Sequence, residues 1–188
     1  MSGNFSQQAI TKAWFVSFLF FFWALIVVYK FNIYPQSPAI SIFYLTLLIN
    51  TYFSVRAFAT ITPRGNWIQG LCDFLLGLCL AIMPLVFNSP VNFVLINLFL
   101  FIIASLKYVF LVSLTGFSKL LYRKIRIDIL GILLCALCLT GILFGFAYWS
   151  LKFFAFIFLL ANVYVLFHRP LYLLEHHLEK IIDDFIKK

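Results

Sequence analysis

The stretch VNFVLINLFLFIIASLKYVF, residues 91–110, decides the class of fold. It contains no acidic residue, and its one basic residue is Lys107, close to the end of the stretch. A helix rises about 1.5 Å per residue, so a run of this length spans about 30 Å, the thickness of the hydrocarbon core of a bilayer. We therefore expect residues 91–110 to form a transmembrane helix.

The composition of the whole chain also indicates a membrane protein. Hydrophobic residues make up 64% of the 188 residues and charged residues 11%, against about 45–50% and about 25% in soluble proteins. So few charged residues could not cover the surface of a soluble protein of this size. The net charge of +8 does not indicate nucleic-acid binding, because the basic residues stand at the ends of apolar runs rather than in one patch.

Six apolar runs are long enough to cross a bilayer. The first is not followed by a small-residue cleavage site, so we expect it to be a helix and not a cleaved signal. Residues 1–170 are thus predicted to form one all-α domain of six transmembrane helices, with a loop over residues 115–126. The predicted spans are Lys12–Tyr29, Ala39–Ser54, Trp67–Phe87, Val91–Phe110, Ile127–Phe146 and Leu151–Phe167.

The basic residues predict the orientation of these helices. Twelve of the fourteen lie at the start of the first run, after the second, at or after the end of the fourth, or after the sixth, and only Lys30 and Lys152 lie on the other side. Loops that carry Lys and Arg face the cytoplasm. We therefore expect both termini to be cytoplasmic, with anionic lipid as a partner of the basic face.

Similar spacings divide the chain into three helical hairpins, at residues 12–56, 64–107 and 126–169. Ser-Pro pairs at 37–38 and 89–90 begin the return helices of the first two, and Ser150 holds the matching place in the third. Both a triplication and the ordinary spacing of a six-span protein explain this pattern. Residues 171–188 alternate apolar and charged positions with helical period, which predicts an amphipathic helix on the membrane surface.

Three polar residues within the spans are the candidate site. Asp73, Asn50 and Asn162 are predicted to lie at about the same depth, each on a helix of a different hairpin. A carboxylate at such a depth costs about 2.5–3.5 kcal/mol unless it is paired or protonated. Together the three could bind a proton or a cation, but interhelical hydrogen bonds that hold the bundle together are the favoured explanation.

Other residues of interest are expected to have structural roles. Gly70 and Gly77, and the pair Gly141 and Gly145 with its GxxxG spacing, predict close packing of helices within the chain or between chains. Asp128 is explained by an i, i+4 ion pair with Lys124. The C-x-x-C of Cys135 and Cys138 lies among leucines, which favours packing over thiol chemistry. No catalytic constellation, metal site or cofactor motif is present in the sequence, so we do not expect an enzyme.

The hairpin from Arg64 to Lys107 resembles the repeat of the HdeD family of bacterial acid-resistance membrane proteins. The resemblance is carried by Trp67 at the start of a helix, Gly77 inside it and Pro84 at its exit. It implies a non-enzymatic inner-membrane protein of six spans that acts in acid stress by assembly or by contact with a partner. The alternative is a small channel or transporter subunit, itself oligomeric, with its polar site around Asp73.

Overall fold

The structure is a computed structural model that describes residues 2–59, 61–63, 65–115 and 118–168. The described residues form six α-helices; a 3-10 turn (η1) continues the third and a π turn (η2) the sixth. With these turns included, all six helices are long and apolar enough to cross a membrane, which confirms the expected class. Their bounds are α1 Ser2–Phe31, α2 Pro38–Phe58, α3 Trp67–Ile82, η1 Met83–Val86, α4 Pro90–Leu114, α5 Ser118–Leu143, α6 Ala147–Val163 and η2 Tyr164–His168.

Local signals explain where the helices begin. The Ser37 hydroxyl accepts a hydrogen bond from the Ala39 N–H at 3.3 Å, and Pro38 fills the first position of α2, where its missing N–H costs nothing. At α3 the Asn66 side chain accepts from the Gln69 N–H at 3.1 Å. These caps place Gln69 in the first turn of α3, facing the interior of the bundle.

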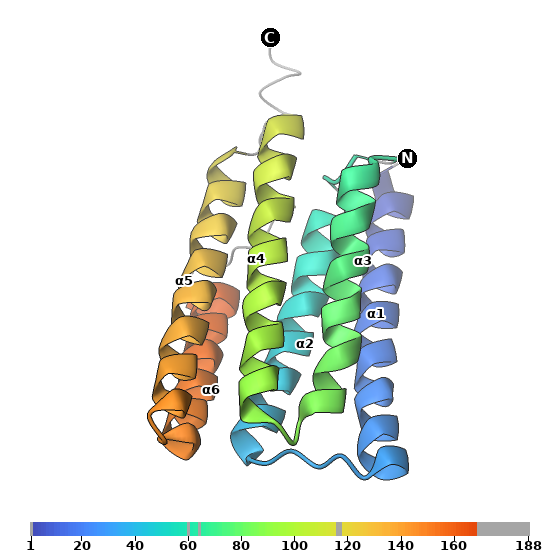
Figure 1. The fold of residues 1–188 in the computed structure, drawn as a ribbon. Coiled ribbons are helices and arrows are strands. Elements are labelled where there is room, and N and C mark those ends of the chain that lie inside the picture. Colours follow the sequence, from blue (N-terminus) through green and yellow to red (C-terminus); the bar gives the residue numbers. More distant parts are fainter. Residues whose placement is uncertain (1, 60, 64, 116–117, 169–188) are drawn as a thin grey trace.

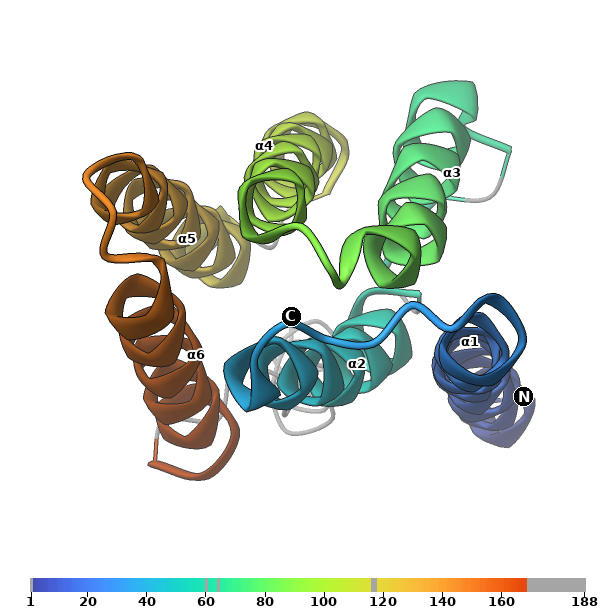
Figure 2. The ribbon, with the colours of Figure 1, turned by 60° about the horizontal axis from the view of Figure 1, so that its bottom comes forward.

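The helices form two rows, α1–α2–α6 and α3–α4–α5 (Figure 2). Each helix contacts the next one along the chain in the pairs α1/α2, α3/α4, α4/α5 and α5/α6, and α2 contacts α6 across one side of the bundle. Figure 1 shows that α1, α3 and α5 begin, and α2 and α4 end, at the same end of the molecule. We call this the basic end, because Lys12, Lys107 and Lys124 lie toward it, and the other the opposite end.

An aromatic cluster fills the half of the bundle nearer the opposite end. The Phe43 ring of α2 lies between the rings of Phe154 and Phe158 of α6, with centroids 4.3 Å and 4.2 Å away. Phe93 of α4 meets Phe43 edge-on at 5.7 Å. Phe43 and Phe93 are completely buried, so this half of the bundle is tightly packed.

The segment 115–126 differs from the predicted loop. Helix α4 continues to Leu114 and α5 begins at Ser118, so Lys119, Lys124 and Arg126 lie on a helix. A hydropathy pattern ends a helix at its charges, whereas Lys, Arg and Leu are good helix formers. Long basic side chains can remain helical while their charged ends reach polar surroundings. The prediction of a loop was therefore wrong.

The close turn between α5 and α6 shows where small residues matter. A Cβ atom on Gly141 would lie 2.1 Å from the Ser150 hydroxyl oxygen and 3.2 Å from the Ser150 Cβ, so a larger residue there would require the hydroxyl to turn away and the two helices to move slightly apart. Gly145 has φ +87° and no neighbouring atom within 4 Å of its Cβ position. Within this chain, Gly141 thus allows close packing, and Gly145 supplies the left-handed backbone of the turn.

Candidate functional site

A cavity of about 710 Å³ lies at the basic end, enclosed by α1, α2, α3, α4 and α5. It runs from the connection between α2 and α3, at Pro63 and Gly65, down to Leu80 and Leu100. Leu80 is thirteen residues into α3, which places the floor of the cavity about 20 Å below that end. Its polar lining consists of Gln8, Lys12, Asn50, Thr51, Ser54, Thr62, Asn66, Gln69, Asp73, Lys107, Tyr108, Lys124 and Asp128.

Asp73 of α3 and Lys107 of α4 form an ion pair inside the cavity. The Lys107 Nζ lies 2.5 Å from the Asp73 Oδ1. The side chain of Lys107 is 11% exposed and that of Asp73 is 46% exposed. An unpaired charge at membrane depth is costly, so each side chain lowers the cost of the other. The uneven exposure leaves Asp73 as the partner that a ligand in the cavity can reach.

Lys124 and Asp128 form a second ion pair, on α5. The two side chains stand one helical turn apart and are almost completely buried, at 6% and 1% exposure. The structure confirms the ion pair that the sequence predicts, and both side chains face the interior of the bundle. The Asp128 Oδ2 atom is buried with no hydrogen-bond partner among the described residues. A buried carboxylate that is half satisfied depends strongly on its lysine.

Tyr108 connects the two ion pairs. Its ring centroid lies 5.9 Å from the Lys107 Nζ and 5.3 Å from the Lys124 Nζ, distances at which a ring face attracts a cation. The Tyr108 hydroxyl shares a hydrogen bond of 2.8 Å with the Ser54 hydroxyl of α2. One tyrosine thus links α2, α4 and α5 beside the cavity.

Gln69 is a further polar residue of the cavity wall, and it is 1% exposed. Its Nε2 donates to the Lys107 carbonyl oxygen at 3.2 Å. Its Oε1 is buried and has no partner among the described residues. Together with the Asp128 Oδ2, this oxygen gives the wall of the cavity two unpaired hydrogen-bond acceptors. Native proteins rarely leave such atoms unpaired unless a water molecule or a ligand satisfies them.

Replacing Tyr108 with phenylalanine tests the link between the helices. Tyr108→Phe keeps the ring and loses the hydrogen bond to Ser54, so we expect stability to fall by about 0.6 kcal/mol and at most about 1.7 kcal/mol. The measurement is the unfolding of the purified protein in detergent. Tyr122→Phe, at a position that is 55% exposed, is the matched control. Equal effects of the two substitutions would contradict the bridging role of Tyr108.

The structure brings together two of the three candidate residues. Asp73 and Asn50 both line the cavity. Asn162 lies elsewhere: it is buried on α6, and its Nδ2 donates to the Phe158 carbonyl oxygen of its own helix at 2.8 Å. Helix α6 packs against α2 and α5, on the side of the bundle away from α3. Equal depth therefore does not place Asn162 in the same cluster.

The remaining candidate glycines lie on the cavity wall. A Cβ on Gly70 would meet no atom within 4 Å, and one on Gly77 would make an ordinary contact of 3.7 Å with the Phe20 ring. Neither permits a tight approach of two helices within this chain. Cys135 and Cys138, by contrast, belong to the buried hydrophobic core.

Sequence reasoning missed the central role of two lysines. Lys107 and Lys124 were counted among the bases of a cytoplasmic loop, whereas both are buried on helices. A usable signal was present, since Lys107 lies within the apolar run 91–110 itself. A base inside a span requires an acid or a polar partner, and Asp73 is the one carboxylate of the preceding span.

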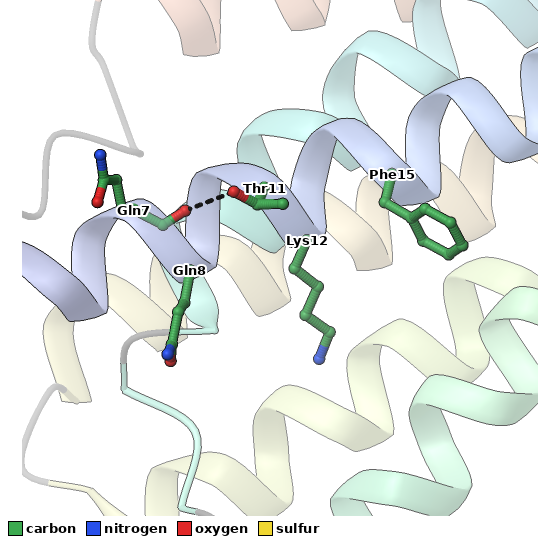
Figure 3. A pocket seen from close by; sticks show the side chains of 5 residues that line it. All are labelled: Gln7, Gln8, Thr11, Lys12 and Phe15. Atoms are coloured by element: carbon green, nitrogen blue, oxygen red, sulfur yellow. Dashed lines mark hydrogen bonds between the residues drawn. The ribbon is translucent and has the colours of Figure 1, made fainter.

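A second hollow follows one face of α1 (Figure 3). It is lined by Gln7, Gln8, Thr11, Lys12 and Phe15, and Thr11 donates a hydrogen bond of 3.0 Å to the Gln7 carbonyl oxygen. All five residues come from a single helix, so no other element encloses a ligand there. Gln8 and Lys12 also line the larger cavity, and the hollow is best regarded as its outer margin.

No protein-family model, no curated protein and no solved structure matches this chain. The HdeD resemblance therefore stays a prediction, and the function has to be inferred from the cavity.

Proposed function

We propose that the protein is a small membrane transporter or channel subunit whose cavity receives a charged ligand. One observation carries this proposal: a cavity that reaches about 20 Å into a membrane-length bundle is lined by two lysine–aspartate pairs. Charged residues within membrane spans commonly mark a route for ions or substrates. If these positions only held the helices together, apolar side chains would be sufficient there.

The orientation that we propose places the basic end in the cytoplasm of a bacterial inner membrane. The positive-inside rule supports it through the twelve basic residues on that side. The six helices would then form three hairpins with both termini cytoplasmic. The amphipathic helix proposed for residues 171–188 lies outside the described residues. In this orientation the cavity opens toward the cytoplasm.

The arrangement corresponds to a state in which the cavity is open at the basic end and closed at the opposite end. Below Leu47, which lines the floor of the cavity, the ring of Phe43 and its aromatic neighbours close the bundle. A transported ligand would bind beside Asp73 and Lys107 and would leave when the aromatic cluster moves apart. The pair contains one positive and one negative side chain. A charged ligand can bind to the side chain of opposite sign, and the two side chains pair with each other again when the ligand leaves.

Neutralising Asp73 tests this proposal. Proteoliposomes would be assayed for movement of K⁺, Cl⁻ and protons, and for transbilayer movement of fluorescent anionic and zwitterionic lipids. We expect the wild type to move at least one of these probes and Asp73→Asn to slow that movement about ten-fold or more, since a charge interaction of about 1.4 kcal/mol or more is lost. Lys152→Gln removes a charge outside the cavity and is the matched control.

Two results would contradict the proposal. One is a wild type that moves none of the probes, and the other is flux that Asp73→Asn leaves unchanged. The second result is what the assembly function implied by the HdeD resemblance predicts, because that function needs no cavity. Loss of stability is separated from loss of flux by measuring the unfolding of both variants in detergent.

A further inference from the structure

Helices α1 and α3 are in contact near the opposite end and diverge toward the basic end. Near the opposite end the Trp23 indole N–H of α1 donates to the Ala81 carbonyl oxygen of α3 at 2.8 Å. Pro84 has no N–H and the chain tightens into a 3-10 turn there, which leaves carbonyls of the last α-helical turn available. Figure 2 shows the two helices separating from this point toward the basic end.

The cavity occupies the space between the separated helices. On the α1 side it is lined by Lys12, Val16 and Leu19, and on the α3 side by Gly70 and Asp73. No atom lies within 4 Å of the Cβ position of Gly70. Leu19 lines the cavity and is 51% exposed. The cavity is therefore bordered by α1 on one side and by α3 on the other.

A lateral opening of this kind exposes a carboxylate at membrane depth. Asp73 lies about 9 Å below the start of α3, and its side chain is 46% exposed. Lipid tails cannot solvate a charge or satisfy polar groups. The surroundings of Asp73 must therefore include water or a polar headgroup, and an amphipathic molecule supplies the headgroup while its chain remains in the bilayer.

The charges of the cavity indicate the sign of that headgroup. Lys12, Lys107 and Lys124 line it with Asp73 and Asp128, so the described lining carries one more positive than negative charge. Lys12 extends from α1 on the side of α3 and α4 (Figure 3). The volume of about 710 Å³ lies within the range of small-molecule sites, and the half-exposed Asp73 carboxylate can accept hydrogen bonds from hydroxyl groups.

From these observations we infer that the ligand is an anionic phospholipid that enters the cavity sideways, between α1 and α3. Its phosphate lies near Lys12, its headgroup hydroxyls donate hydrogen bonds to the exposed Asp73 carboxylate, and its acyl chains extend through the opening past Gly70 and Leu19. This inference rests on the proposed function and names its ligand class. A single negative headgroup charge balances the single excess positive charge of the cavity.

Thermal unfolding of the whole purified chain in a neutral detergent tests the inference. The probes are phosphatidylglycerol, phosphatidylcholine with the same chains, and glycerol 3-phosphate without chains. We expect phosphatidylglycerol to reach half of its stabilising effect at a concentration about ten-fold lower than phosphatidylcholine. Glycerol 3-phosphate should stabilise the protein only weakly.

Three variants locate the binding. Gly70→Trp places a large side chain at the opening, where a Cβ meets no atom within 4 Å, and we expect it to weaken the effect of phosphatidylglycerol about ten-fold. Leu71→Trp adds the same side chain to the adjacent position, which is 47% exposed and outside the cavity lining, and should leave the effect unchanged. Lys12→Glu at the exposed mouth should abolish the preference for the anionic lipid even if Gly70→Trp fails to fold.

The outcomes separate this inference from the proposed function. Equal stabilisation by both lipids, or equal effects of Gly70→Trp and Leu71→Trp, would overturn the lateral lipid site. Strong stabilisation by glycerol 3-phosphate alone would mean that the ligand enters from water, which also overturns it. In each of these cases, flux of K⁺, Cl⁻ or protons that depends on Asp73 would leave the transport function standing.

Discussion

Lys124→Met is expected to destabilise the protein by about 3–5 kcal/mol, because it leaves the buried Asp128 carboxylate without its lysine. Asp128 is 1% exposed, and its second oxygen already lacks a partner among the described residues. Neither water nor lipid can replace the lost ammonium group at that position. Equilibrium unfolding in mixed micelles measures the effect.

The double variant Lys124→Met/Asp128→Leu provides the decisive comparison. Replacing both members of a buried pair with apolar residues of similar size is often neutral, so the double variant should be more stable than Lys124→Met. Lys119→Met, at an exposed position on the same helix, is the matched control and should change stability by less than about 0.5 kcal/mol. A double variant that is no more stable than Lys124→Met would show that the pair is not coupled.

Phe43→Ala is expected to have the second large effect, on both stability and permeability. The Phe43 ring makes two stacked contacts and one edge contact with its neighbours. At about 0.5–1.5 kcal/mol for each aromatic pair, their loss amounts to about 1.5–4.5 kcal/mol. Phe43 lies one helical turn beyond Leu47 at the floor of the cavity, so the substitution also thins the barrier at the opposite end.

Proteoliposomes that contain Phe43→Ala should therefore leak small ions that the wild type retains or passes slowly. Phe74→Ala makes the same chemical change at a position that is 66% exposed and away from the aromatic cluster, and it should not leak. Phe43→Leu keeps more of the packing and replaces Phe43→Ala in this assay if the alanine variant does not fold. An intact barrier in a folded Phe43→Ala protein would show that the aromatic cluster does not close the cavity.

The helices were predictable because their signals are local. Apolar runs of membrane length identify the spans, and the Ser-Pro pairs mark the starts of α2 and α4 where the structure has them. The helix ends that lie in charged segments were less predictable, and the loop expected over residues 115–126 is largely helix α5. Hydropathy measures the preference for lipid, whereas a helix continues as long as its backbone and side chains allow it.

The candidate site was predictable only in part. Asp73 was identified because a carboxylate within a span is unusual whatever its neighbours are. Its partner Lys107 lies 34 residues further along the chain. The place of Lys107 inside an apolar run indicates an acidic partner, but its proximity to the other bases led to its assignment to a cytoplasmic loop. Asn162 was grouped with Asp73 on depth alone, but depth leaves the rotation of each helix about its axis and its place in the bundle undetermined.

The amino-acid sequence by itself thus determined that this chain is an all-α protein of six membrane-length helices, because hydrophobic length and helix capping depend on neighbouring residues. Only the tertiary structure decided that two lysine–aspartate pairs face one cavity, that Asn162 lies outside it, and that α1 and α3 separate at the basic end. Those features depend on contacts between distant segments, such as the Trp23–Ala81 hydrogen bond, which no local pattern encodes.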